Sequence, residues 1–273
     1  MCIRDSMTAE DNYRLKSNMS GMNPSAFWNV VKQGGYFQYM FNTLQINNGD
    51  DTFSDVAQYT NTSSTDWSWA NLIADFDNDG LKDIYVTNGL LRDIRNTDAE
   101  KNLGEFVVEI AENYVKNNPN QGDIDLWDIL PLDEALKLVP SVKLKNYFYK
   151  NYGDLKLKNE TKKWGLDQLS FSNGAAYADL DNDGDLDIAV NNFNQPANLY
   201  RNNSSAPRVT VTLKGIKPNS HGIGARILVK SNNLLQSQEI VSGGRYLSAD
   251  ESRRTIAAKE KNESIKVIWR SGS

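Results

Sequence analysis

The stretches DFDNDGLKDIYV (residues 75–86) and DLDNDGDLDIAV (residues 179–190) decide the fold of this chain. Each has the form Asp-x-Asp-x-Asp-Gly-x-x-Asp and continues into an apolar, β-branched run, so four carboxylates fall within nine residues. Four like charges this close together repel one another, and a bound dication is the simplest compensation. The sequence therefore predicts two cation sites, each leading directly into a strand.

Calcium suits this spacing because it accepts about six to eight oxygen ligands in a flexible geometry. Side chains at loop positions 1, 3 and 5 converge, glycine at position 6 permits the turn, position 7 offers its carbonyl, and position 9 closes the site. The predicted ligands of the first site are Asp75, Asp77, Asp79, the carbonyl of Leu81, and Asp83. The predicted ligands of the second site are Asp179, Asp181, Asp183, the carbonyl of Asp185, and Asp187.

Two other structures are compatible with part of this loop pattern. An EF-hand begins similarly but needs Glu at position 12 and a helix on both sides. Position 12 is Val86 or Val190 here, inside runs typical of strands, which excludes EF-hands. A polar Asp-Asn-Asp-Gly turn without metal is the alternative for one loop. Two copies with all carboxylates intact favour the metal.

The duplication extends beyond the loops. A shift of 104 residues brings Asp75 onto Asp179 without a gap. The same shift superposes residues of similar type, among them Trp67 on Phe171, Ser68 on Ser172, Ile84 on Ile188 and Asn88 on Asn192. Each unit contains short predicted strands: TLQIN, TFSDV, NLIADF and DIYVT in the first, and NYFYK, LKLKN, GAAYADL and DIAVN in the second. Repeats of this kind predict β-propeller blades, and a propeller needs about four or more, so we expect a partial propeller.

The chain divides into several predicted parts. Residues 1–6, MCIRDS, resemble a translated sequencing-adapter read-through and are not expected to be native, which sets aside Cys2, the single cysteine. Residues 7–206 form the partial propeller. From residue 207 to 273 the segments RVTVTLKG, ARILVKS, QSQEIVS and SIKVIW alternate apolar and polar residues. We predict a separate, truncated antiparallel β domain there.

A helical insertion is expected at about residues 92–146. Thr97-Asp98-Ala99-Glu100 has the spacing of a capping box, and Pro119 ends the helix. The apolar residues that follow helical spacing on one face are Leu103, Phe106, Val107, Ile110, Ala111 and Tyr114. A second helix is expected from about residue 132 to 139. The apolar face predicts a lid packed on the propeller, and the alternative is that it frames a ligand pocket.

Composition and missing motifs argue against catalysis and against nucleic acid. The net charge of −5 offers no basic surface for phosphates, and no apolar run approaches the roughly 18 residues of a transmembrane helix. The only histidine, His221, lies in a glycine-bounded turn, and no serine elbow or phosphate-cradling loop occurs. Trp67 and Trp69 are weak candidates for stacking on a sugar ring; the alternative is that they are core aromatics.

The paired acidic loops resemble VCBS/FG-GAP repeats, the blade units of integrin-α-type β-propellers. The segments that resemble an ASPIC/UnbV domain are NLYRNN (198–203), VTLKG (211–215), NSHGIGARI (219–227), GGRYLS (243–248) and VIWRSG (267–272). That domain follows such repeats in the cartilage acidic protein family and in bacterial surface proteins of the Bacteroidetes type. The chain departs from the family pattern at Arg270, where proline is usual, and at residues 255–258, where Thr-Ile-Ala-Ala replaces Phe-Gly-Leu-Gly.

The resemblance implies an exported, calcium-dependent protein without assigned catalysis. The expected function is that of a secreted or cell-surface module that binds two Ca²⁺ ions and attaches to an extracellular protein or glycan. We expect no nucleic-acid partner and no transmembrane segment in this stretch. One alternative is a carbohydrate-active enzyme or its glycan-binding accessory module. Another is a secretion or assembly factor whose helical insertion docks a partner.

Overall fold

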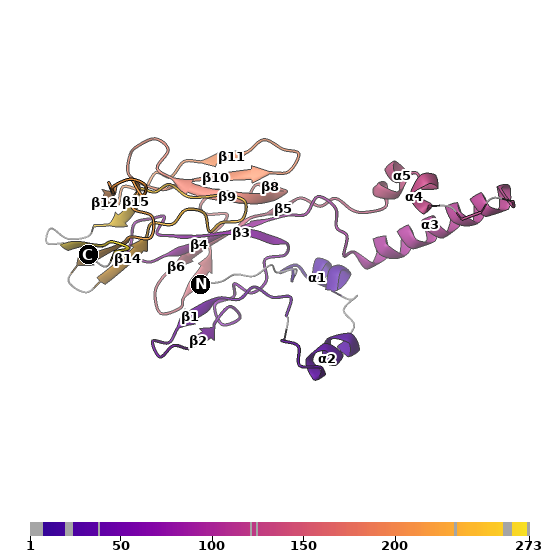
Figure 1. The fold of residues 1–273 in the computed structure, drawn as a ribbon, viewed down its shortest axis with the longest axis horizontal. Coiled ribbons are helices and arrows are strands. Elements are labelled where there is room, and N and C mark those ends of the chain that lie inside the picture. Colours follow the sequence, from indigo (N-terminus) through magenta and orange to yellow (C-terminus); the bar gives the residue numbers. More distant parts are fainter. Residues whose placement is uncertain are drawn as a thin grey trace.

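The fold is mainly β, as predicted. The computed structural model describes residues 8–19, 24–37, 39–120, 122–123, 125–231, 234–258 and 264–271; the six adapter-like residues lie outside these ranges. Small antiparallel sheets form the body of the molecule, with the helices at one end (Figure 1). Within the described ranges no sheet closes into a barrel, which fits the predicted partial propeller.

The first acidic loop joins two strands of a four-stranded sheet, here called blade 1. In order across the sheet, its strands are β3 (Ser68–Ala74), β4 (Asp83–Asn88), β6 (Tyr147–Asn151) and β7 (Leu157–Asn159). Every residue of β4 is buried because both faces of the sheet are covered. The predicted strands exist, but their grouping was wrong: NYFYK and LKLKN join NLIADF and DIYVT in blade 1. A sequence repeat shows the period of a unit and not where the unit begins.

The second acidic loop joins the strands of a three-stranded sheet, here called blade 2. Its strands, in order, are β11 (Asn198–Tyr200), β10 (Asp187–Asn192) and β9 (Ser172–Ala178). The pairing of β9 with β10 repeats that of β3 with β4: Ala178 faces Asp187 as Ala74 faces Asp83. Both ladders also contain an irregularity near their far end. The 104-residue shift is therefore a structural repeat.

The two blades share one core. Blade 1 contributes Leu72, Tyr85 and Phe148, and blade 2 packs Ile188 and Val190 against them. Burial of each large apolar side chain contributes roughly 1.5–3 kcal/mol, so this contact is a main source of stability. A hairpin of β1 (Gln45–Asn47) and β2 (Phe53–Asp55), with its flanking residues, packs against the opposite face of blade 1.

The C-terminal part has its own core, centred on Ile227, Val229, Ile240 and Ile256. Its strands are β12 (Arg208–Val211) paired with β15 (Arg254–Ala257), and β13 (Arg226–Ser231) between β14 (Leu234–Glu239) and β16 (Ser264–Ile268). Strand β15 was not predicted. All four of its residues are buried, so it lacks the alternation that marks a half-exposed strand.

The insertion is helical as predicted, but it does not pack as a lid. Its helices are α3 (Thr97–Asn117), α4 (Leu126–Ile129) and α5 (Leu132–Lys137). They extend away from the sheets (Figure 1), and α3 contacts α1 (Asn12–Met19), α4 and α5 more extensively than any strand. The helix cap is Asn96 and not Thr97, because Asn96 Oδ1 accepts the N–H of Ala99 at 2.9 Å.

The remaining elements are short. Helix α2 (Pro24–Lys32) precedes the first hairpin, and β5 (Leu144–Lys145) pairs with β8 (Leu169–Ser170) between the blades. None of the helices within the described ranges has the length and apolar character needed to cross a bilayer.

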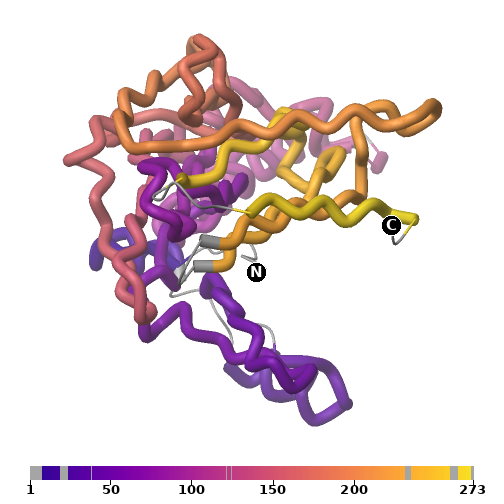
Figure 2. The backbone as a smooth tube through the Cα atoms, turned by 90° about the vertical axis from the view of Figure 1, so that its left-hand side faces the viewer, coloured from indigo at the N-terminus to yellow at the C-terminus, as the bar shows by residue number. Residues whose placement is uncertain are grey.

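Strand β9 is the edge of blade 2, and a segment of the C-terminal domain covers it. Ser248 Oγ donates to the carbonyl of Ala175 at 2.8 Å, and Asp250 accepts the N–H of Tyr177 at 3.4 Å. The backbone trace shows the C-terminal segments, in orange and yellow, next to the blades (Figure 2). The two parts of the chain are therefore joined along an otherwise unpaired sheet edge.

Candidate metal centres

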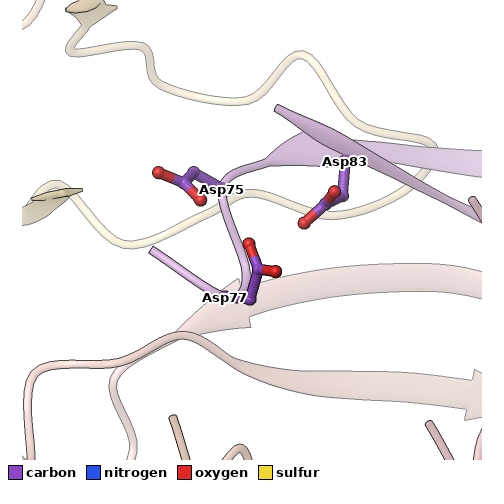
Figure 3. A group of neighbouring side chains, drawn as sticks. All are labelled: Asp75, Asp77 and Asp83. Carbon is purple, nitrogen blue, oxygen red and sulfur yellow. The ribbon is translucent and has the colours of Figure 1, made fainter. Parts of the chain in front are cut away.

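The first acidic loop brings three carboxylates together. Asp75 directly follows β3, Asp77 lies in the loop and Asp83 begins β4, and one oxygen of each lies within 4.8 Å of the others. Figure 3 shows Asp77 and Asp83 pointing toward each other, with Asp75 beside them. Asp75 and Asp83 are buried and Asp77 is half-buried. These are loop positions 1, 3 and 9 of the sequence prediction.

The second loop repeats this geometry. Asp179, Asp181 and Asp187 offer oxygens within 4.8 Å of one another; the first and third are buried and Asp181 is exposed. The supporting hydrogen bonds are also repeated: Gly80 donates its N–H to Asp75 at 2.8 Å, and Gly184 donates to Asp179 at 3.0 Å. The clusters are thus built in the same way from separate stretches of sequence.

Backbone conformation gives both loops their shape. Gly80 has φ +91° and Gly184 has φ +92°, the left-handed region that glycine adopts without strain. Asn78 and Asn182, at position 4, also have positive φ, at +55° and +61°. Asparagine is among the few other residues that tolerate this region. The Asp-Asn-Asp-Gly sequence therefore specifies a loop in which positions 1 and 3 point toward position 9.

The ninth-position aspartates tie each loop to the rest of its blade. Asp83 accepts the N–H of Phe76 at 3.2 Å and the N–H of Asn151, on β6, at 2.9 Å. Asp187 accepts the N–H of Leu180 at 2.9 Å and that of Asn202 at 2.8 Å. Each of these carboxylate oxygens accepts one of the two hydrogen bonds and is able to accept another, so capacity for a cation remains.

Each cluster contains a buried carboxylate oxygen without a partner. Within the described part of the chain, Asp77 Oδ1 and Asp179 Oδ1 are buried and accept no hydrogen bond. A buried, unsatisfied charged oxygen is costly, and native structures contain few of them. A cation bound in the first cluster would satisfy Asp77 Oδ1, and a cation bound in the second would satisfy Asp179 Oδ1.

Burial also shifts the titration of the first cluster. Desolvation raises the pKa of Asp83 to about 8, with a further contribution from the charge of Asp77. Desolvation likewise raises the pKa of Asp75 to about 6. Water no longer solvates these carboxylates well, so an approaching cation meets less competition from solvent.

Positions 5 and 7 lie outside the clusters of three. Asp79 and Asp183 accept the N–H groups of the residues two further on, at 2.8 and 3.0 Å. The carbonyls of Leu81 and Asp185 stay predicted ligands. The side chain of Asp185 has a separate role: it is fully buried and accepts the N–H of Ser204 at 2.9 Å. The sequence indicates this separate role, because Asp185 is an acid at the loop position where the first repeat has Leu81.

A basic side chain lies beside each loop, and sequence reasoning missed both. Lys150 pairs with Asp77, and with Asp79 at 2.9 Å. Arg201 lies 2.7 Å from Asp181. Both residues belong to the third strand of a blade or follow it directly. They neutralise part of the loop charge at positions 3 and 5. In the second loop Arg253 also lies 3.5 Å from Asp179, at position 1.

The two candidate tryptophans lie at the other end of blade 1. Trp67 directly precedes β3, and the acidic loop directly follows β3. The seven residues of this strand therefore separate Trp67 from the loop by about 20 Å. Trp67 stacks on Trp69 with ring centroids 6.3 Å apart, and Trp69 contacts Tyr246 of the C-terminal domain at 5.2 Å. Both tryptophans are half-buried. The pair therefore contributes to packing between domains, and sugar stacking stays a prediction.

Two sequence families match the chain. The FG-GAP-like repeat matches residues 30–86, a range that includes the first acidic loop between its strands. The family described as ASPIC and UnbV matches residues 215–273. The chain thus has one segment similar to an FG-GAP-like repeat and a C-terminal segment similar to the ASPIC and UnbV family. No curated protein matches it.

The matches agree with the resemblance seen in the sequence. The FG-GAP-like match begins in α2 and ends in β4, so it spans the junction between the β1–β2 hairpin and blade 1. The second loop lies beyond the matched range, yet it has the register and the acidic cluster of the first. An FG-GAP-like repeat joined to an ASPIC/UnbV domain indicates a repeat-based binding module, and both acidic clusters are able to hold a metal ion.

Proposed function

We propose that this protein is an extracytoplasmic, non-catalytic binding module in which two calcium ions stabilise the blades. The observation that carries the proposal is the duplicated cluster, in which three carboxylates converge and one buried oxygen is left unpaired. The FG-GAP-like match over the first loop supports it independently.

The donor set fits calcium better than other common ions. All the available ligands are oxygens, and neither loop contains the histidine or cysteine that zinc favours. Calcium–oxygen bonds of about 2.3–2.6 Å place opposite ligands roughly 4.6–5.2 Å apart, which accommodates a cluster whose oxygens span up to 4.8 Å. Magnesium requires shorter bonds and a stricter octahedron. Asp75, Asp77 and Asp83 would hold one ion, and Asp179, Asp181 and Asp187 the other.

The ions would be structural. In each blade the cluster links the end of the first strand to the start of the second. The ninth aspartate already accepts a hydrogen bond from the third strand in blade 1, and from Asn202, two residues after the third strand, in blade 2. A bound cation would neutralise the loop and fix this three-strand junction. Its positive charge would compensate for the solvation by water that the carboxylates lose when they are buried.

Calcium titration of three variants tests the proposal. Isothermal titration of the wild type should give two bound ions, and Asp83→Asn and Asp187→Asn should each give one. Asp50→Asn, which changes an exposed aspartate of the β1–β2 hairpin, should still give two. Calcium at about 100 times its Kd should stabilise the fold by roughly 2.7 kcal/mol per site. Absence of binding in the wild type, or equal binding by all four proteins, would overturn the proposal.

The helical insertion supports a second candidate, an assembly role. Exposed apolar side chains gather on it: Val108, Val115, Trp127, Leu132 and Leu136. Such residues on a projecting element are typical of a protein–protein contact. Replacing Trp127 and Leu132 with alanine should abolish capture of a protein partner while calcium binding is retained. If the wild type and this variant capture the partner equally well, the insertion does not have this role.

The enzymatic alternative predicts a different result. A carbohydrate-active enzyme would release new reducing or unsaturated ends from polysaccharides, whereas a binding module retains the polysaccharide without cleaving it. Incubation of the protein with polysaccharides in calcium, followed by an assay of both kinds of end, separates the two classes.

A further inference from the structure

A cavity of about 260 Å³ lies between the blades and the C-terminal domain. Blade residues such as Ala74 and Tyr177 form one side of it, and β14 and β15 form the other. Among the described residues, the cavity is lined by four cations, Lys82, Arg245, Arg253 and Arg254, and by one carboxylate, that of Glu239. Such an excess of positive charge is unusual in a chain whose net charge is −5.

Arg254 is the most unusual member of this group. Only 3% of the residue is exposed, yet no carboxylate of the described residues lies within ion-pair distance of it. Its Nε donates to the carbonyl of Glu239 at 3.1 Å, and its Nη1 donates to the carbonyls of Glu251 and Arg253. Buried charges are normally paired, because main-chain dipoles compensate only part of the desolvation.

Arg245 and Lys82 add unused donors. Arg245 Nη2 pairs with Asp250 at 2.6 Å, but its Nε is buried and has no acceptor within the described ranges. Lys82 is exposed at the rim and, within the same ranges, forms no ion pair. Arg253 is different, because its guanidinium is already committed to Glu251 at 2.9 Å and Asp179 at 3.5 Å.

From this arrangement we infer that the cavity binds one oxyanionic group, a sulfate or phosphate, through the side chains of Arg245, Arg254 and Lys82. Arginine N–H groups match the oxygens of such an anion, and lysine adds a point charge. The volume is several times the roughly 30 Å³ of a water molecule, enough for one such group. The anion would also bridge the blades and the C-terminal domain, since its ligands come from both.

Sulfate titration of the full chain in EDTA tests the inference without calcium. Wild-type protein should bind inorganic sulfate, and Lys82→Gln and Arg245→Lys should each weaken binding by about tenfold, the effect of losing one charge-assisted hydrogen bond. Arg245→Lys keeps the charge that faces Asp250. The matched control is Lys156→Gln, an exposed lysine of blade 1 outside the cavity, which should bind sulfate like the wild type. It also reports any general salting effect of sulfate.

The source of the anion is separated by comparing ligands. A sulfated disaccharide that binds more tightly than inorganic sulfate, and loses affinity in the same two variants, identifies an acidic glycan; equal affinity identifies the free ion. The unsulfated disaccharide should not bind. The inference fails if wild-type protein binds no sulfate, or if both cavity variants bind like the control. Calcium stoichiometry measured on the same proteins keeps this result distinct from the fate of the proposed function.

Discussion

Lys150 lies beside the first acidic loop in the same way as Arg201 lies beside the second. In each blade the next residue, Asn151 or Asn202, donates its N–H to the ninth-position carboxylate, at 2.9 and 2.8 Å. The two cations therefore occupy equivalent points, and each pairs with the acids at loop positions 3 and 5. Each loop therefore has a positively charged side chain of its own, and a metal ion has to share the loop carboxylates with it.

Replacing Lys150 with glutamine should strengthen calcium binding at the first site by about threefold to tenfold. The reason is that a cation close to Asp77 and Asp79 repels the incoming ion. The same variant should be less stable in EDTA, since the carboxylates lose their partner. Calorimetric titration and thermal melting measure the two effects. Lys158→Gln, an exposed position on β7, is the control. If calcium does not restore the stability lost in Lys150→Gln, the loop carboxylates are neutralised by Lys150 and not by a bound ion, which would contradict the prediction.

Stability should depend on pH in opposite directions with and without calcium. Burial raises the pKa of Asp83 to about 8 and that of Asp75 to about 6, from 3.8. Without metal, the stability that these groups contribute is present below the unfolded value and is lost as pH rises through the folded values. The melting temperature in EDTA should therefore fall between pH 6 and pH 8. Calcium needs ionised ligands, so its affinity should rise over the same interval.

Asp83→Asn provides the control for this pH effect. Its metal-free melting temperature should fall much less between pH 6 and pH 8, because Asp83 is gone and the pKa of Asp75, about 6, lies at the lower end of this interval. A wild-type melting temperature that rises with pH in EDTA would contradict the assignment.

Phe148→Ala should destabilise the protein by about 3–5 kcal/mol. The side chain is fully buried between the blades, and its ring lies 4.2 Å from that of Trp164. Denaturant unfolding measures the loss. Phe53→Ala, on the exposed side of the β2 strand, should cost less than about 0.5 kcal/mol. Equal costs would mean that the blades do not share a core in solution.

Deleting residues 97–137 should leave both blades intact. The base of the insertion is closed by its flanking residues: Asp93 donates its N–H to Pro140 at 2.8 Å, and Arg92 reaches the carbonyl of Val139 at 3.1 Å. A short Gly-Ser linker can therefore replace the helices. The shortened protein should still bind two calcium ions, with a melting temperature within a few degrees of the wild type. Loss of either ion would show that the helices support the loops.

Local sequence signals predicted the acidic loops and the strands around them. The positions that converge, such as Asp75 and Asp83, lie within nine residues, so turn chemistry alone brings them together. The strand register around the loops was predictable because the two sequence copies share it. The assignment of strands to blades was not predictable, because it depends on contacts across the 58-residue stretch between β4 and β6.

Contacts between distant residues explain what was missed. Lys150 is 73 positions from Asp77, and Arg254 reaches the cavity from another domain, so no local pattern marks either. The predicted apolar face of α3 is only half-buried, and Ala99 is the buried residue of this helix, because amphipathicity does not specify which surface covers a face. The cap shifted from Thr97 to Asn96 because either residue can accept the same type of bond.

The segment that runs along β9 has a consequence for solubility. An unpaired strand edge is a template for another chain, and soluble proteins shield such edges against intermolecular pairing. Ser248 and Asp250 occupy hydrogen-bonding groups of Ala175 and Tyr177 that would otherwise be open to a neighbouring molecule. Detachment of this segment would turn blade 2 into a seed for aggregation, so the C-terminal domain also acts as an intramolecular guard against self-association.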